Sequence, residues 1–334
     1  MKRPKDGGNL KYLSILFLLI ACPVHAETFK VVVYGDTHDW RDGAPIINGY
    51  NDWIIANHDA LNIEYVLHLG DLVQVPSDLG VTATSMHLLD GEVPYLISIG
   101  NHDYDGWYTL PSSGWTTGSF TTAFPVATFE DWVGDKHYST NMLNAYDTIT
   151  VDGESYLFMA LEYCPSDAVI AWADGILSAN TDKHVIIAIH YYFETFGTAG
   201  IRATNDDDYS GGVCTNNGSG KALYQNVFKN YPNIMMILSG HGWDLTSKYL
   251  DGTITKVDVI SGSNINQIRE NWQADTRGNL YLRIYTIDTG TDVIRVQSYS
   301  PSTDTYLLNS EDNFYLNRTS YRLENVTCEG IIIQ

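Results

Sequence analysis

The chain has 334 residues, of which 44% are hydrophobic, so it can bury the core of one large domain or of two small ones. Its 40 acidic side chains outnumber its 19 basic ones and give a formal net charge of -21. A field of that sign repels nucleic-acid backbones and anionic membranes, and no cluster of Lys and Arg is dense enough to reverse it, so we expect neither as a partner.

The first 26 residues have the composition of a secretory signal peptide. Four basic side chains precede an almost wholly apolar run at residues 12–21, and Val24 and Ala26 place small residues where a signal peptidase cuts. A run of about ten apolar residues is too short for the roughly 20 that a membrane-spanning helix needs. We therefore predict cleavage after Ala26 and a secreted or periplasmic protein.

The cysteines bear on the same question of export. Leu19-Ile20-Ala21-Cys22 resembles a bacterial lipoprotein box, so a membrane anchor through a lipidated Cys22 is the alternative to a freely released protein. Cys164, Cys214 and Cys328 remain after cleavage. An odd count in an exported protein leaves at most one disulfide and one free thiol, and the sequence alone does not choose the pair.

Five short apolar runs, each bounded by polar residues, predict buried strands. They occupy residues 30–34, 65–69, 95–99, 185–189 and 234–239. Helix-like stretches lie between them at residues 44–60, 165–180 and 221–230. Alternation of strand and helix is typical of an α/β layer with the helices outside.

After residue 241 the pattern changes to alternating apolar and polar residues, which predicts antiparallel strands. These segments are residues 248–250, 254–260, 280–287 and 293–299. We predict one domain of two packed sheets flanked by helices at residues 27–320, followed by a tail at residues 321–334. Two aperiodic segments, residues 105–122 and 197–220, are expected to form walls or lids of a pocket.

Residues that can ligate a metal follow all five apolar runs. They are Asp36, His38, Asp71, Asn101, His190 and His241. Because ligands of α/β sheets gather at the carboxyl ends of strands, we expect these side chains to converge. Two divalent ions roughly 3.5 to 4 Å apart hydrolyse phosphate esters, and such a pair needs a bridging carboxylate, for which Asp71 is suited. Asp36 and His38 can then reach one ion from a single turn.

Other side chains beside these ligands suit the chemistry of a hydrolase. His102 could protonate a departing alkoxide or bind a phosphoryl oxygen, and the adjacent Asp103 could orient it. Aromatic residues flank the ligands in sequence and predict a substrate-binding rim for a flat leaving group, with packing in the core as the alternative. The residues assigned to this rim are Tyr104, Trp107, Tyr191 and Trp243.

The motifs D-x-H, G-D, G-N-H-D, a lone His after a strand, and G-H occur in this order over residues 36–241 and resemble the calcineurin-like metallophosphoesterase superfamily. The resemblance implies a four-layer fold of two β-sheets with flanking helices and a binuclear centre of divalent ions such as Mn, Zn, Fe or Mg. It also implies hydrolysis of phosphate mono- or diesters by attack of a metal-bridging hydroxide. The resemblance assigns the first metal to Asp36, His38 and Asp71, the second to Asp71, Asn101, His190 and His241, and catalysis to His102.

The last motif departs from the family pattern. The family usually ends it with G-H-x-H, whose second His binds the first metal, but this chain reads Gly240-His241-Gly242-Trp243. The first metal is therefore left with three protein ligands and is expected to bind weakly. The alternative function is a non-catalytic extracellular binding protein with a degraded metal site.

Overall fold

The computed structural model describes residues 28–38, 44–106, 116–195, 201–202, 214, 217–241, 254–260, 263–271, 281–291, 293–309 and 312–317. The predicted signal peptide, the tail at residues 321–334, and the predicted site residues Trp107 and Trp243 lie outside these ranges.

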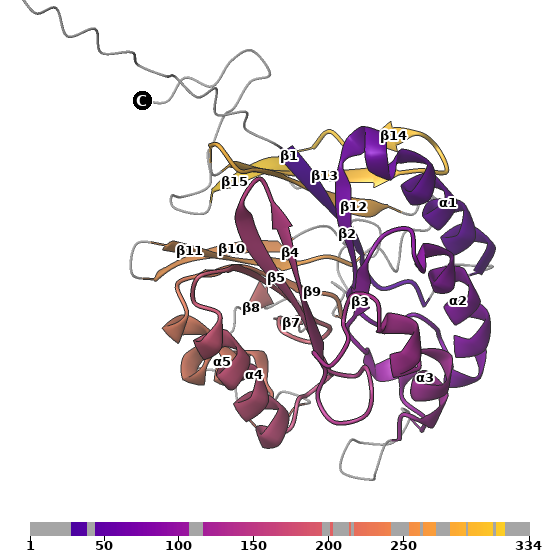
Figure 1. The fold of residues 1–334 in the computed structure, drawn as a ribbon, viewed down its shortest axis with the longest axis horizontal. Coiled ribbons are helices and arrows are strands. Elements are labelled where there is room, and N and C mark those ends of the chain that lie inside the picture. Colours follow the sequence, from indigo (N-terminus) through magenta and orange to yellow (C-terminus); the bar gives the residue numbers. More distant parts are fainter. Residues whose placement is uncertain are drawn as a thin grey trace, which may run out of the picture.

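Two mixed β-sheets pack face to face, and helices cover the outer side of each (Figure 1). The first sheet has seven strands in the order β14-β13-β12-β1-β2-β3, with β15 also paired to β13. The strands β1, β2 and β3 are parallel neighbours, whereas β12 runs antiparallel to β1. Its members are β1 (Thr28–Tyr34), β2 (Ile63–His68), β3 (Tyr95–Ile97), β12 (Leu282–Asp288), β13 (Val293–Ser300), β14 (Thr305–Tyr306) and β15 (Asn313–Asn317).

The second sheet has six strands in the order β10-β11-β9-β6-β5-β4. The strands β5, β6, β9 and β11 are parallel, and an antiparallel strand closes each edge. Its members are β4 (Ala145–Val151), β5 (Glu154–Leu161), β6 (His184–Ile189), β9 (Ile234–Ser239), β10 (Ile254–Ile260) and β11 (Ser263–Arg269). Two short strands, β7 (Glu194–Thr195) and β8 (Ile201–Arg202), pair with each other.

Helices form the two outer layers. Three of them, α1 (Ala44–Leu61), α2 (Leu79–Met86) and α3 (Gly118–Ala123), lie on the side of β1 to β3, and α4 (Asp167–Ala179) and α5 (Gly220–Asn226) lie on the side of the second sheet (Figure 1). Short 3₁₀ turns connect the layers at Pro76–Asp78, His87–Leu89, Asn101–Asp103, Val126–Phe129 and Phe228–Asn230. None of the helices in the described ranges has both the length and the apolar character of a membrane span.

Helix α4 illustrates how sequence fixes this outer layer. The hydroxyl of Ser166 accepts a hydrogen bond from the backbone N–H of Val169 and so caps the first turn. Val169, Ala173 and Leu177 recur at every fourth position and are buried. These side chains join the cluster that the second sheet contributes through Val185 and its neighbours. The helix therefore covers the sheet with a single apolar stripe.

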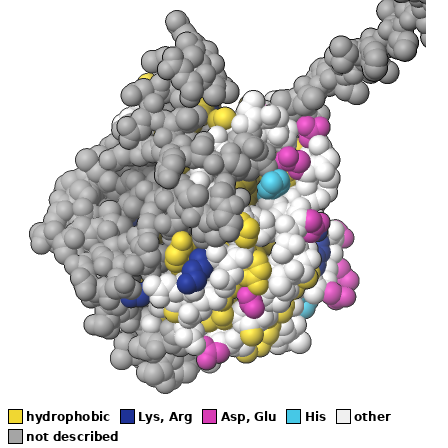
Figure 2. Space-filling model, turned by 90° about the vertical axis from the view of Figure 1, so that its left-hand side faces the viewer, with side chains coloured by type: hydrophobic (Ala, Val, Ile, Leu, Met, Phe, Trp, Pro, Cys, Tyr) yellow, Lys and Arg dark blue, Asp and Glu magenta, His cyan; other side chains and the backbone are white. Residues whose placement is uncertain are grey.

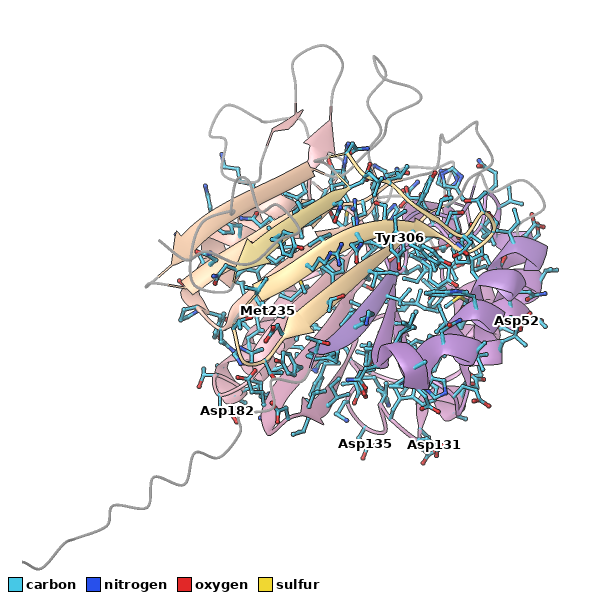
Figure 3. All side chains as sticks on the ribbon, turned by 90° about the horizontal axis from the view of Figure 1, so that it is seen from above. Asp52, Asp131, Asp135, Asp182, Met235 and Tyr306 are labelled. Carbon is cyan, nitrogen blue, oxygen red and sulfur yellow. A yellow bond between two sulfur atoms is a disulfide. The ribbon has the colours of Figure 1, made fainter. Side chains whose placement is uncertain are left out.

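The main core lies between the two sheets. Tyr65 of β2 stacks on Phe158 of β5 with ring centroids 3.9 Å apart, and Phe29 of β1 meets Tyr156 of β5 edge to face at 4.7 Å. Because helices and the opposite sheet cover both faces of β1, its residues form a continuous apolar run rather than an alternating one. Seen from above, side chains fill the space between the sheets (Figure 3).

The surface carries the excess acidic charge. Asp52, Asp131, Asp135 and Asp182 are exposed and point outward at the periphery in Figure 3. On the face shown in Figure 2, acidic side chains are spread over the described surface and basic ones are few. The described part of this face has no stripe of basic side chains of the kind that binds nucleic acids.

The four-layer fold predicted from sequence is confirmed. All five strands predicted before the metal-ligating motifs form, as do the three predicted helices. The antiparallel strands predicted at residues 254–260, 280–287 and 293–299 form as β10, β12 and β13, and the strand predicted at residues 248–250 lies outside the described residues. The structure adds β11, which pairs in parallel with β9. The structure adds the hairpin of β4 and β5 and the helix α2, which were not predicted.

Candidate metal centre

The six predicted ligands come from the carboxyl ends of five strands, three in one sheet and two in the other. Asp36 and His38 follow β1, Asp71 follows β2, Asn101 begins the turn after β3, His190 follows β6 and His241 follows β9. Ser98 joins the two sheets at this end: its hydroxyl donates to the carbonyl of Leu161 at 2.7 Å and accepts from the N–H of His190 at 2.9 Å. The predicted convergence therefore takes place where the two sheets meet.

Asp71 occupies the middle of this group. Its Oδ2 lies 3.2 Å from Nε2 of His190 and 3.9 Å from Nε2 of His38. Among the described residues, potential ligand atoms form two sets of three, and the atoms of each set lie within 4.8 Å of one another. One set joins His38, Asp71 and His102, and the other joins Asp71, His190 and His241. Asp71 is the only member shared by both sets, which is the position of a bridging carboxylate.

The side chains predicted for the second metal lie together. Nε2 of His190 is 3.1 Å from Nδ1 of His241 and 3.2 Å from Oδ1 of Asn101. Nδ1 of His190 lies 2.8 Å from the carbonyl of Leu69, which can only accept, so Nδ1 carries a proton. In the neutral ring this bond leaves the lone pair of Nε2 directed at the other ligands, as a metal site requires.

The His38 side of the site depends on Gln74, which was not predicted. Nδ1 of His38 lies 2.6 Å from Oε1 of Gln74, and Nδ1 of His102 lies 3.1 Å from the backbone carbonyl of the same residue. The two imidazole rings stack with centroids 4.3 Å apart. Both rings therefore present Nε2 as the nitrogen that Gln74 does not hold. The signal in the sequence was only that Gln74 follows Asp71 by three residues.

Asp36 lies outside both three-residue sets, although it adjoins them. Its Oδ1 is 3.7 Å from Nδ1 of His190 and accepts from the backbone N–H of His241 at 3.1 Å. Its Oδ2 accepts from the side-chain amide of Asn271 at 2.9 Å. The carboxylate is 1% exposed and is thus fixed through both oxygens.

Asp103 has a different role from the predicted one. Its Oδ1 accepts from the N–H of Leu72 at 2.8 Å and its Oδ2 accepts from the N–H of Gly100 at 2.9 Å, so it does not orient the ring of His102. These bonds tie the turn after β2 to the turn after β3. Asp103 is fully buried and supports the backbone that carries Asp71 and Asn101. Gln74, rather than Asp103, holds Nδ1 of His102.

The backbone at two ligands is strained. Asp71 has φ of 52° and His241 has φ of 47°, in the left-handed region that non-glycine residues rarely adopt. Glycines allow the surrounding chain to approach: a Cβ at Gly100 would overlap Asp71, and one at Gly240 would overlap the carboxylate of Asp36. Strain of this kind persists where the surrounding structure imposes it and is common at functional sites.

Burial and mutual charge shift the titration of the site. Burial, opposed by His190 and reinforced by Asp71, raises the pKa of Asp36 to about 6. Burial would also raise the pKa of Asp71, but the charge and hydrogen bond of His190 hold it below its ordinary value. Burial would lower the pKa of His190, but Asp71 and then Asp36 raise it to about 9. The imidazolium of His190 thus balances the carboxylates in the metal-free protein.

The residues present fit a pair of divalent ions. Carboxylate, amide and imidazole donors suit ions such as Mn²⁺, Zn²⁺ and Fe²⁺. The Asp71 carboxylate is shared, and the hydrogen bonds at Nδ1 of His38 and His190 direct Nε2 of each ring toward it. The described ligands are more complete on the side of His190 and His241 than on the side of Asp36 and His38. The position of Trp243 lies outside the described residues.

The described aromatic residues of the predicted rim are buried. Tyr104 is 8% exposed and belongs to the core, and Tyr191 is 3% exposed. The ring of Tyr191 meets the ring of His241 edge to face at 4.9 Å, and Tyr163, which was not predicted, lies 5.7 Å from the same histidine. These rings form a wall behind a metal ligand rather than an exposed rim. Contact of Tyr104 or Tyr191 with substrate stays a prediction.

A disulfide lies beside this wall. Cys164 follows Tyr163 directly and pairs with Cys214, with Cα atoms 5.3 Å apart. The bond resolves the pairing that the sequence left open and ties the end of β5 to residue 214, which precedes α5. Cys328 lies outside the described residues.

Comparisons with known proteins give relatives in sequence and in fold. The uncharacterized protein YvnB of Bacillus subtilis (strain 168) is 26% identical over 314 residues, which are 88% of this chain but 22% of that protein. Among solved structures, the purple acid phosphatase PPD1 from yellow lupin seeds has a TM-score of 0.56 at 13% identity, covering 91% of this chain and 58% of its own. A dimetal phosphatase from Danio rerio has a TM-score of 0.51 at 10% identity, covering 87% of this chain and 99% of its own.

The chain thus spans less than a quarter of the curated relative, and the two solved structures show likeness of fold. Residues 29–245, more than half of the chain, match the family of calcineurin-like phosphoesterases. This match includes every predicted metal ligand and the strands that carry them. The chain belongs to the calcineurin-like phosphoesterase family.

Proposed function

We propose that this protein is an exported, metal-dependent hydrolase of small phosphate mono- or diesters. The observation that carries the proposal is the buried carboxylate of Asp71, which is shared by two sets of potential ligand atoms. Membership in the calcineurin-like phosphoesterase family supports the same reaction class. Two divalent ions, when bound, would supply an activated water and neutralise charge on the phosphoryl oxygens.

The side chains have distinct roles in this proposal. Asp71 would contribute to both ions, Asn101, His190 and His241 would hold the second, and Asp36 and His38 would hold the first. Nε2 of His102 faces the site because Gln74 binds its Nδ1. An anionic phosphoryl group beside His102 would favour its protonated form, in which Nε2 donates to a phosphoryl or leaving-group oxygen.

The activity is tested with the full-length protein after metal analysis. Hydrolysis of p-nitrophenyl phosphate and of bis-p-nitrophenyl phosphate is measured as purified, after chelation, and after return of manganese or zinc. We expect chelation to abolish turnover of at least one substrate and metal to restore it. A protein that holds two ions per chain and hydrolyses neither ester nor any of a broad phosphoester panel would contradict the proposal.

Export forms part of the proposal because of two independent features. The amino-terminal segment has a signal-peptide pattern, and Cys164 forms a disulfide with Cys214, which persists in oxidising compartments. Mass spectrometry of the protein from a secreting host distinguishes release after signal-peptide cleavage from attachment to a membrane through a lipid. A mature chain that begins at Glu27 supports release, and a diacylglyceryl mass on Cys22 supports a lipid anchor. An uncleaved chain in the cytosol would contradict export.

A second candidate is a non-catalytic binding protein, which the sequence favours at one position. Trp243 stands where the family usually has a second histidine ligand for the first metal. Metal content separates the candidates: two ions per chain favour the hydrolase, and one or none favours the binding protein. If the missing ligand is the cause, Trp243→His should raise the metal content.

A further inference from the structure

We infer that Asn271 is a positioning residue for Asp36, so that strands beyond the matched residues 29–245 complete the metal centre. The inference rests on the proposed two-metal hydrolase and adds to it the segment that holds the first metal's carboxylate. Asn271 follows β11 and is fully buried. Its side-chain amide donates to Oδ2 of Asp36 at 2.9 Å.

The contact fixes the direction of the carboxylate. Oδ1 of Asp36 already accepts from the N–H of His241 at 3.1 Å, so the two hydrogen bonds hold the carboxylate through both of its oxygens. A carboxylate held in this way keeps its remaining lone pairs in fixed directions. Groups that orient a metal ligand typically contribute about 10- to 100-fold to metal affinity.

The chain brings Asn271 to this position through a close approach of the two sheets. A Cβ on Gly35 would lie 2.9 Å from the carbonyl oxygen of Glu270, so only glycine leaves room there without displacement of the backbone. The N–H of Glu270 donates to the carbonyl of Ser239 at 2.8 Å, which extends the pairing of β11 with β9. Asn271 is therefore carried by the second sheet and reaches across to the end of β1.

A buried cluster of Glu270, Arg283 and Asp312 fixes the chain at residues 270 and 271. Nε of Arg283 lies 3.5 Å from Oε1 of Glu270, and its Nη2 lies 3.6 Å from Oδ1 of Asp312. Tyr285 donates to Glu270, and the hydroxyl of Ser298 donates to Asp312 at 2.8 Å. These contacts fix the position of Glu270 and so of the adjacent Asn271.

The position of Trp243 makes this support more important at one metal than at the other. The first metal has three expected ligands, of which Asp36 is one, whereas the second has four. Misplacement of Asp36 would therefore remove one of the three expected ligands of the first metal and none of those of the second. The inference therefore predicts a defect confined to one of two ions, which a general loss of stability would not produce.

The test compares Asn271→Ala with Asn266→Ala by binding of Mn²⁺. Asn266 lies within β11, the strand that precedes Asn271, is equally buried, and donates to the backbone carbonyl of Met235 at 3.1 Å. Equilibrium dialysis at graded free Mn²⁺, with elemental analysis, gives the number of ions and the affinity of each. We expect wild-type protein to bind two ions. In Asn271→Ala, one ion should bind at least about tenfold more weakly. Asn266→Ala should bind both ions normally even if its melting temperature falls.

The outcomes separate this inference from the proposed function. Wild-type protein that binds fewer than two ions would contradict the proposed function itself. Wild-type protein with two ions and Asn271→Ala with the same two affinities would overturn the inference alone, as would equal weakening of both ions in both variants. If Asn271→Ala does not fold, Asn271→Ser is measured instead. Its shorter hydroxyl cannot span to Asp36, and the same loss at one ion is expected.

Discussion

At the scale of single residues, Asp71 combines three properties that are unfavourable unless its side chain is required where it lies. It is 2% exposed, it adopts the left-handed region with φ of 52°, and its carboxylate lies among four histidines. Its Oδ1 accepts from the N–H of His102 at 2.9 Å, while Oδ2 faces His190 and His38. One oxygen is thus tied to the backbone and the other faces the imidazoles.

We predict that Asp71→Asn loses both ions, because each set of ligands includes this carboxylate. The proposed phosphoesterase activity should fall by about 100-fold or more, since a pair of divalent ions supplies most of the catalysis in a two-metal hydrolase. Elemental analysis and steady-state kinetics provide the measurements. Asp147→Asn is the matched control, because Asp147 is also buried but is not one of the candidate ligands. Its Oδ1 instead pairs with Nζ of Lys136 at 2.7 Å. Retention of two ions in Asp71→Asn would show that Asp71 is not the bridge.

We also predict that His102→Ala keeps both ions and loses about 100- to 10,000-fold in kcat, as expected for a general acid. The predicted role requires Nε2 of His102 to face substrate, which its bond to the carbonyl of Gln74 permits. His58→Ala serves as the control because His58 is partly exposed and lies on α1. A normal kcat would remove the catalytic role. Loss of one ion would instead identify His102 as a ligand beside His38.

The convergence of the candidate ligands could be predicted because each follows an apolar run and a glycine or strand end, both of which are visible in sequence. Their supporting residues could not. Gln74, Ser98 and Asn271 act through hydrogen bonds across turns or between sheets, and no local pattern marks a residue for such a contact. Asp103 was assigned to His102 because the two are adjacent in sequence, whereas the fold turns its carboxylate toward the backbone.

At the scale of elements, the parallel strands and their connections could be predicted more easily than the edges. The strands β1, β2, β6 and β9 are buried on both faces and so appear as continuous apolar runs. In contrast, β4 has a mixed burial pattern, and β11 carries Asn264, Asn266 and Gln267 within it. These buried polar side chains find partners only in the folded sheets, so their strand has no apolar signature.

Ser98 gives the element scale its own prediction, because it connects β3 to both β5 and β6. Ser98→Ala removes the donor to Leu161 and leaves the N–H of His190 without its acceptor in a buried place. We expect the free energy of unfolding to fall by about 1 to 3 kcal/mol. Denaturant titration of metal-free protein measures this change. Ser178→Ala, which removes an exposed hydroxyl bonded to Gly175 within α4, should change it by less than about 0.5 kcal/mol. An equally small change in the free energy of unfolding for Ser98→Ala would show that its hydrogen bonds do not stabilise the junction of the two sheets.

At the scale of the whole molecule, the two sheets are joined by an apolar core and, near the end of β11, by the ionisable side chains of Glu270, Arg283 and Asp312. The apolar part was predictable as a fold class, because strand and helix patterns alternate along the chain. The charged part was not, since Glu270, Arg283 and Asp312 are far apart in sequence and ordinarily lie on surfaces. Here all three are buried, and one guanidinium faces two acidic side chains.

The excess of two acidic side chains over one guanidinium predicts how the free energy of unfolding depends on pH. Burial, opposed by Arg283 and reinforced by Asp312, raises the pKa of Glu270 from 4.5 to about 8. Its Oε2 has no hydrogen-bond partner among the described residues, which also favours the protonated acid. Because the folded protein holds this proton more tightly than the unfolded chain, the contribution to stability is complete below pH 4.5. It is lost as the pH rises through about 8, at up to about 1.4 kcal/mol per pH unit.

Glu270→Gln isolates the effect because glutamine resembles the protonated acid and does not titrate. Unfolding free energies are measured from pH 5 to pH 9 in the presence of a chelator, so that metal binding does not contribute. We expect wild type and Glu270→Gln to be similar near pH 5 and the wild type to lose stability relative to the variant as the pH rises. Glu92→Gln, at an exposed position, should follow the wild type throughout. Parallel curves for Glu270→Gln and wild type would mean that Glu270 is ionised in the folded protein, balanced by Arg283. The cluster would then stabilise the junction of the sheets as an ion pair.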